Sequence, residues 1–506
     1  MGLQGALFTA VDGLRLVSRQ ASVLSRNVSN AGTPDYTVKR VTVEALAEGG
    51  IRVGETTRQI DVSLRTEARI VRGQATHAEV LERALNPLVA LNGSPGAADS
   101  ISDLVTALRD SLTSLRARPS DLSDQRSALR IAGDLSARLN ELAAAVGRAR
   151  QAAQDELARQ VSGANRLTQQ ISRLDAEARA TRAGGAADSY TLDRRDAAIQ
   201  QLSELLDVTP AFGTRDQVTL ILRGGYTLPL KPDDAPFSIA SGPVTPEAYY
   251  GAPDGTLPAL MLGEIDITAL TRNGRMGALL ELRDAILPQM QAELDILAST
   301  LATRFDAQGL RLFTDGASAT AAPPDVTASA GYSGSVVGFA GRITVSSAVT
   351  TEPRLLRDGT HGAPETGFEP NPPGGPAGFT GLLDNLLNYT FGIATGPGGT
   401  PHPMTPTANL GPGRDLAASF NPPIRLADHA AAMTGSHAVA ASEATGRLTE
   451  TSASRTRIDL LLQQREGVDV DQEMAGLLQL QNAYAANARV LAAVQEMWDA
   501  LLRAAR

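Results

Sequence analysis

The sequence contains no cysteine, which excludes disulfides, thiolate metal sites and cysteine nucleophiles. Aromatic residues make up only 4% of the 506 residues, so aliphatic side chains and alanine must supply most of the apolar core. Lysine occurs only at Lys39 and Lys231, and arginine supplies the remaining cations. We interpret this imbalance as the codon bias of a GC-rich genome.

No apolar run approaches the length of about 18 residues that a membrane-spanning helix needs. The first seven residues lack a basic region before an apolar block, so we do not expect a cleaved secretory signal. A net charge of −9 argues against a general surface for nucleic acid or anionic membrane. The length suffices for three or four ordinary domains.

Both ends of the chain carry heptad patterns that are typical of a coiled-coil seam. The N-terminal seam consists of Leu3, Leu7, Ala10, Leu14, Val17, Ala21, Leu24, Val28 and Ala31. The C-terminal seam consists of Leu477, Leu480, Tyr484, Asn487, Leu491, Val494, Trp498 and Leu501. Asp469 is the expected N-cap of the second helix, with Gln472 three residues later, and Asn487 is the polar seam residue that could set the register.

Ordering these two helices costs backbone conformational entropy. Burial of one apolar seam stabilises the pair by less than this cost. We therefore expect both termini to be frayed in the monomer and to become ordered against neighbouring subunits. The alternative is an intramolecular hairpin at the base of a globular domain.

The segment from Ser25 to Tyr36 follows the first seam, and its residues are typical of the C-terminal end of a helix. Gly32 suits a left-handed C-terminal position, and Pro34 prevents the helix from continuing. Together with the heptads, this segment resembles the N-terminal signature of bacterial flagellar axial proteins, in the positions Asn27, Asn30, Thr33, Pro34 and Tyr36. That family usually has glycine where Asp35 stands.

Three later segments narrow the resemblance to the hook-associated members of this family. Residues 192–196, Leu-Asp-Arg-Arg-Asp, resemble a Leu-x-x-Arg-Asp motif, and residues 277–284, followed by Leu287 and Pro288, resemble a second one. Residues 467–502 resemble the C-terminal signature, part of which hook and rod proteins share. The resemblance covers about half of the chain, in order from end to end.

The resemblance implies a structural protein of the hook–filament junction, which is exported through the flagellar type III channel and serves motility outside the cell. Its implied partners are the hook protein, hook-associated protein 3, further copies of itself in a ring at the hook tip, and a cytosolic export chaperone that covers the C-terminal helix. The apolar face for such a chaperone consists of Leu491, Val494, Trp498 and Leu501. The resemblance implies no nucleic acid, membrane or cofactor.

The expected fold is α+β and multidomain. We predict a terminal-helix coiled coil over residues 1–45 and 467–506, and an elongated helical bundle over residues 46–209, 273–310 and 426–466. The bundle includes helices near residues 99–115 and 121–182, the latter closed by Gly184 and Gly185. We predict an inserted, mainly β outer domain over residues 210–272 and 311–425, where glycine, proline and short β patterns such as 218–222, 226–228 and 343–345 are frequent.

No pattern for catalysis or metal binding emerges. The histidines are His77, His361, His402, His429 and His437; the last two are eight residues apart on one expected helix, too far apart for a shared metal without a third ligand. Acidic residues occur at every second position over Asp469, Asp471 and Glu473, as in the first half of a calcium-binding loop. Capping of the helix N-terminus explains them more simply. We interpret Asp193 to Asp196 as a surface or interdomain ion pair.

Two alternatives to the junction role remain open. One is a hook or distal rod subunit, which shares both terminal signatures but not the long central helices. The other is an axial protein whose inserted domain is an enzyme, for which the only cluster in residues 311–425 is Asp358, His361, Glu365 and Glu369.

Overall fold

The computed structural model describes residues 3–45, 51–93, 100–183, 189–213, 217–251, 254–316, 321–327 and 331–504. The chain divides into two compact units, each assembled from separate stretches of sequence. Unit 1 comprises Met1–Thr76, Ser162–Phe237 and Thr449–Arg506, and unit 2 comprises His77–Val161 and Ser238–Leu448. The finer division into three domains stays a prediction.

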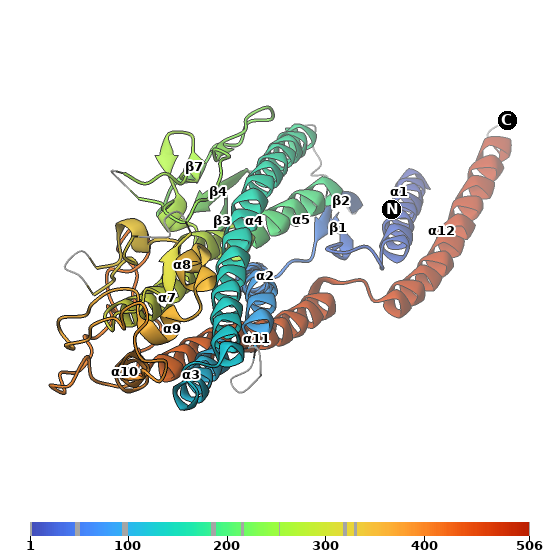
Figure 1. Cartoon of the computed structure of the whole chain (residues 1–506). Coiled ribbons are helices and arrows are strands. Elements are labelled where there is room, and N and C mark those ends of the chain that lie inside the picture. Colours follow the sequence, from blue (N-terminus) through green and yellow to red (C-terminus); the bar gives the residue numbers. More distant parts are fainter. Residues whose placement is uncertain are drawn as a thin grey trace. The chain divides into compact units, whose positions relative to one another are not determined.

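Long helices dominate the described residues (Figure 1). They are α1 (Leu3–Ser29), α2 (Val62–Asn92), α3 (Ile101–Ala117), α4 (Leu122–Ala183), α5 (Ser189–Leu205), α7 (Leu287–Asp306), α11 (Leu426–Glu466) and α12 (Val470–Ala504). Shorter helices are α6 (Gly274–Glu281), α8 (Ser347–Thr351), α9 (Leu355–Asp358) and α10 (Gly381–Asn385), with single turns η2 (Thr268–Leu270), η3 (Leu282–Ile286), η4 (Gly334–Val336), η5 (Phe339–Gly341) and η6 (Leu386–Thr390).

The longest helix, α4, forms where the sequence predicts one, near residues 121–182. α4 has 62 residues, which corresponds to about 90 Å at 1.5 Å per residue. Its buried positions include Leu135, Leu139, Leu157 and Ile171, whereas Leu122 at its first turn is exposed. The expected closing residues Gly184 and Gly185 lie outside the described residues.

The strands are short and pair antiparallel. They are β1 (Lys39–Ala45), β2 (Ile51–Arg58), β3 (Val208–Phe212), β4 (Val218–Leu222), β5 (Thr227–Leu228), β6 (Phe237–Ser238), β7 (Met261–Leu262), β8 (Ile265–Asp266), β9 (Phe313–Asp315) and β10 (Ile343–Val345). The expected hairpin of β4 and β5 forms with Leu220 opposite Leu228, and Gly224 and Gly225 both have positive φ in its turn. The pairing of β1 with β2 was not predicted.

Residues 311–425 contain less strand than the sequence suggested. Their described strands are β9 and β10, three residues each, and short helices and irregular segments make up most of the remainder. The many glycines and prolines explain this difference, because they favour turns and interrupt ladders. The α+β class of the whole chain is confirmed.

The core of unit 2 forms around α7. This helix is buried on almost every side, including Met290, Leu294, Leu297 and Leu301, which recur at helical spacing. Asp295 on the same helix accepts hydrogen bonds from the Tyr332 hydroxyl and from the backbone N–H groups of residues 338 and 340. Among the described residues, no helix combines the length and the apolar character that crossing a membrane requires.

Candidate assembly interface

The two terminal helices pack against each other as an antiparallel hairpin (Figure 1). A Cβ atom added at Gly13 of α1 would lie 3.1 Å from the side-chain amide of Asn487 on α12, and one added at Gly476 would lie 2.8 Å from Leu24. Near the end of α1, Asn27 Nδ2 donates a hydrogen bond to Glu473 Oε2 at 2.9 Å. These three pairs share one register, so the hairpin is aligned along its length. This is the intramolecular arrangement that the sequence left as the alternative.

The polar seam residue Asn487 lies opposite a glycine. Because Gly13 has no side chain, the two helices can approach closely at this position, and the amide of Asn487 fills the space. The N-cap of α12 also forms as expected, since Asp469 Oδ1 accepts from the backbone N–H groups of residues 471 and 472.

The predicted seam residues differ in burial. Those buried in the hairpin or its root are Val17, Asn27 and Val494, and those partly buried are Leu7, Leu14, Leu24, Val28, Asn30, Tyr36, Leu477, Leu480, Asn487 and Leu491. Those exposed are Thr33, Pro34, Tyr484, Trp498 and Leu501. The side chain of Leu3 lies outside the described residues. Tyr484, Trp498 and Leu501 are 52%, 41% and 57% exposed, so α12 presents an apolar surface that α1 does not cover.

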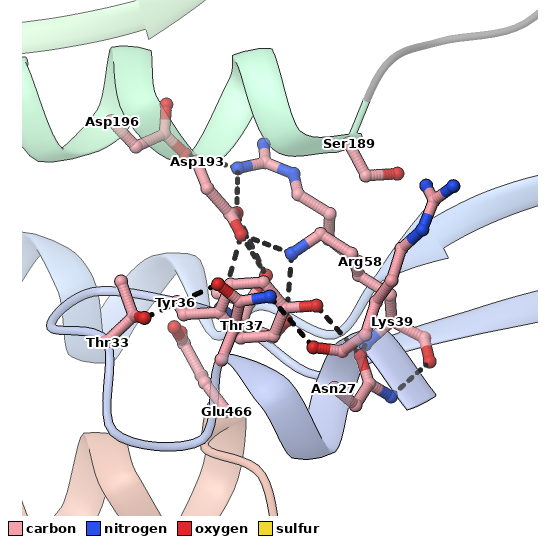
Figure 2. Close-up of polar contacts among 12 residues, drawn as sticks. Asn27, Thr33, Tyr36, Thr37, Lys39, Arg58, Ser189, Asp193, Asp196 and Glu466 are labelled. Atoms are coloured by element: carbon pink, nitrogen blue, oxygen red, sulfur yellow. Dashed lines mark hydrogen bonds and ion pairs between the residues drawn. The ribbon is translucent and has the colours of Figure 1, made fainter. Parts of the chain in front are cut away.

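Asn27 is the centre of a buried polar cluster at the root of the hairpin (Figure 2). Its side chain is fully buried, and its Nδ2 donates to the carbonyl of Lys39 at 3.0 Å as well as to Glu473. Its Oδ1 accepts from the Tyr36 hydroxyl at 3.0 Å and from the backbone N–H of Lys39 at 3.3 Å. The amide therefore uses its full hydrogen-bonding capacity, and it joins α1, β1 and α12.

Lys39 is the buried cation of this cluster. Its Nζ lies 2.5 Å from Asp193 Oδ2, donates to the carbonyl of Thr37 at 3.1 Å, and lies 3.5 Å from the centre of the Tyr36 ring. A second ring, that of Tyr190, lies 4.6 Å away. Burial, followed by the neighbouring Tyr190 and Asp193, raises the pKa of Tyr36 far above its ordinary value, so this ring stays neutral and stacks on the cation.

Asp193 and Asp196 form a buried network, so of the two interpretations of this motif, a surface or an interdomain ion pair, the surface ion pair is wrong. Arg58 Nη1 lies 3.0 Å from Asp193 Oδ1 and 2.8 Å from Asp196 Oδ2. Arg65 joins Asp196 at 3.1 Å to Glu466 at 2.7 Å. All of these side chains are at most 16% exposed, because α2, α5, β2 and the end of α11 meet here.

The arginines of the two Leu-x-x-Arg-Asp motifs are both buried. Arg195 contacts Asp175 at 3.0 Å in unit 1, and Asp175 also accepts from the backbone N–H of Val218. In unit 2, Arg283 donates to Gln154 at 2.7 Å and to the carbonyl of Pro258 at 3.0 Å. The motifs therefore tie a helix to neighbouring segments within each unit.

The sequence did not identify Lys39, Arg58, Arg65 or Glu466 as members of the cluster. The residues of the cluster come from three distant parts of the sequence, and charged residues that meet only in the fold form no local sequence pattern. The available signal was the rarity of lysine, since Lys39 is one of two in the chain and directly follows the signature segment.

The histidine and acidic candidates are engaged in ordinary contacts. His437 Nε2 lies 2.7 Å from Glu293 Oε2 and its Nδ1 lies 3.1 Å from Asn92 Nδ2. Asp358 pairs with Arg357 at 2.7 Å and accepts from Asn371. Over the ranges that the structure describes, no group of three His, Asp or Glu side chains is arranged to hold a metal ion.

Comparisons with known proteins give two family matches. Residues 93–315 match the flagellar hook-associated protein FlgK helical domain, and residues 464–504 match the C-terminal region of flagellar basal body rod FlgEFG proteins. Among solved structures, the chain is similar to the flagellar hook junction protein FlgK from Burkholderia pseudomallei, with 22% identity and a TM-score of 0.41. That match covers 50% of this chain and 44% of the other, so it spans less than half of the length of that protein. The comparison with curated proteins gives no match.

Proposed function

Because the chain belongs to the family of flagellar hook-associated proteins, we propose that it is hook-associated protein 1, the structural protein that assembles at the hook tip and connects the hook to the filament. The observation that carries this proposal is the aligned hairpin of α1 and α12 with an apolar surface left exposed on α12. Exposure of these apolar side chains to water is unfavourable in free energy, and burial against neighbouring subunits makes the exposure unnecessary.

Polymerisation supplies the burial that a single hairpin lacks. The hairpin carries exposed Phe8 on α1 and exposed Leu478, Met497, Trp498 and Leu501 on α12. In a ring of copies, these side chains pack on adjacent hairpins, and the terminal helices then become fully ordered. The hook protein below and hook-associated protein 3 above are the proposed neighbours of this ring.

Before assembly the same apolar surface requires protection. We propose a cytosolic export chaperone that covers the end of α12, where Trp498 and Leu501 are exposed. Export through the flagellar type III channel then delivers the chain to the outside of the cell. Leu491 and Val494, which were expected on this face, are partly and fully buried in the described hairpin.

A hook or distal rod subunit is the second candidate. It is favoured by the match of residues 464–504 to rod proteins, whereas the match of residues 93–315 to the hook-associated helical domain favours the junction role and covers more of the chain. An enzymatic inserted domain has no comparable support.

Immunogold labelling of isolated flagella with an antibody against unit 2 distinguishes these roles. We expect the label in one narrow zone between hook and filament. Label along the hook, or at the rod below it, would show that the chain is a hook or rod subunit instead.

A further inference from the structure

A cavity of about 340 Å³ opens beside the polar cluster, entirely within unit 1. Its walls are the signature segment 31–37, α2, α5, the end of α11 and the two residues that lead into α12. Arg65, Arg69 and Arg72 project from α2 into these walls, one or two turns apart. These arginines share the cavity, which lies at the root of the terminal hairpin, with the carboxylates of Asp35, Asp196, Asp459 and Glu466.

Arg69 is the cation in this cavity that has no carboxylate partner. Arg65 pairs with Asp196 and Glu466, and Arg72 pairs with Asp459 at 2.7 Å. The guanidinium of Arg69 donates only to the Thr66 hydroxyl, at 3.0 Å, and no described carboxylate lies within 4.0 Å of it. Burial lowers the pKa of Arg69, and the charge of Asp196 compensates only in part.

A second donor in the cavity also lacks an acceptor. Gln200 on α5 is nine-tenths buried, and its Nε2 has no hydrogen-bond partner in the described part of the chain. A buried amide without an acceptor costs about 1–3 kcal/mol. The carboxylates of the cavity pair with arginines, although Asp196 Oδ1 has no hydrogen-bond partner. No described acceptor forms a hydrogen bond with Gln200 Nε2, and the only one that Arg69 reaches is the Thr66 hydroxyl.

We propose that this cavity binds a carboxylate side chain from α12 of an adjacent copy of the chain, held by Arg69 and by the amide of Gln200. A carboxylate offers two acceptor oxygens, which match a guanidinium and an amide N–H. The inference rests on the proposed function, since it names the contact that neighbouring copies make in the ring.

Two features identify a second copy as the partner. The cavity is continuous with the terminal hairpin, since its wall includes the residues that follow α1 and those that precede α12. On α12, Asp471, Glu496 and Asp499 are exposed and form no ion pair with the described residues. The hairpin thus supplies free carboxylates next to the surface through which copies are proposed to associate.

The near absence of lysine permits a direct test. Arg69→Lys keeps the charge and adds an amine to a chain whose only other lysines are the buried Lys39 and the exposed Lys231. A carbodiimide links such an amine to a carboxylate that it contacts. Isolated flagella carrying this variant are treated, and the chain is analysed by denaturing gel and by mass spectrometry, with the natural chain as control.

We expect covalent dimers and larger multimers of the variant but not of the natural chain, with residue 69 joined to an acidic residue of α12. Cross-links confined to the monomer, such as one from residue 69 to Asp196, would overturn the proposal. A cross-link from residue 69 to a different protein, or no cross-link at all, would overturn it as well.

A second variant measures the contribution of the contact. Arg69→Gln removes the charge, and Arg194→Gln makes the same change at an exposed arginine of α5. We expect at least a tenfold loss of filament-bearing cells for Arg69→Gln and none for Arg194→Gln, in a strain lacking the natural gene. If Arg69→Gln supports filaments fully while the strain without the gene makes none, the carboxylate site is refuted and the junction role stands. If the strain without the gene makes normal filaments, the junction role itself fails.

Discussion

Asn27 and Glu473 lie 446 positions apart in the sequence, yet the side-chain amide of one donates to the carboxylate of the other at 2.9 Å. Glu473 is itself buried, and its other oxygen lies 3.5 Å from Arg40. The two ends of the chain are therefore joined by one polar contact at the root of the hairpin, and the apolar packing of α1 and α12 extends from it.

Replacing Asn27 should loosen this root. Asn27→Ala removes the hydrogen bonds to Glu473, to the Tyr36 hydroxyl and to both backbone groups of Lys39, and we expect a loss of about 2–4 kcal/mol. Urea unfolding followed by circular dichroism measures this loss as a lower midpoint. The control is Asn30→Ala, which removes two exposed hydrogen bonds, one that Asn30 donates to the carbonyl of Arg26 and one that it accepts from the Thr33 hydroxyl. Equal midpoints for the two variants would contradict the account.

Gly13 should be sensitive to a single methyl group. Gly5→Ala, in open space on the same helix, should stabilise the chain by about 0.5–1 kcal/mol because alanine is the better helix former. Gly13→Ala should lose this gain, because its Cβ would lie 3.1 Å from the amide of Asn487. Adding Asn487→Ala should restore it, as a double-mutant cycle by thermal unfolding would show. Identical effects at Gly5 and Gly13 would mean that the helices are not this close.

Asp193 should contribute far more to the stability of the folded chain than its exposed neighbour Arg194. Asp193→Asn leaves Lys39 buried without a counter-charge, which we expect to cost about 3–5 kcal/mol, whereas Arg194→Gln should be neutral. Combining Asp193→Asn with Lys39→Met should recover part of the loss. Urea unfolding followed by circular dichroism tests this, and a neutral Asp193→Asn would show that the pair contributes nothing.

His429 should make unit 2 sensitive to acid. Burial, with the nearby charge of Arg304, lowers the pKa of His429 to about 4. The unfolded chain binds a proton at this residue below about pH 6.5, so stability is lost as the pH falls from about 6.5 towards 4, by about 3 kcal/mol in total. His429→Asn should remove this part of the pH dependence relative to the natural chain. If the free energy of unfolding changes with pH equally in the natural chain and in His429→Asn between pH 4 and 7, His429 has no such effect.

Trp498 should contribute to assembly rather than to the stability of the monomer. Because its side chain is 41% exposed at the end of α12, Trp498→Ala should change the melting temperature by less than about 2 °C. The same variant should reduce incorporation into flagella or binding of the chaperone. A large fall in melting temperature would show that this end of the hairpin is already packed in the monomer.

The long helices could be predicted from the sequence because their signal is local and periodic. Leu135, Leu139 and Leu142 recur on one face of α4, and the structure buries all three. The buried cluster could not be predicted in the same way, since Lys39, Asp193 and Glu466 become neighbours only through the fold. For the motif at Asp193, the spacing could not decide between a surface and an interdomain ion pair, because spacing alone does not reveal burial. Asp35 has φ +58°, which explains why glycine is usual at this position of the signature.

The central claim is that this chain joins the hook to the filament, and a clean deletion of the gene tests it most directly. Hooks are scored by electron microscopy, and flagellin is measured in the medium. The account predicts hooks without filaments, with flagellin shed as monomer. Absent hooks would place the protein in the rod or hook, and normal filaments would contradict the junction role altogether.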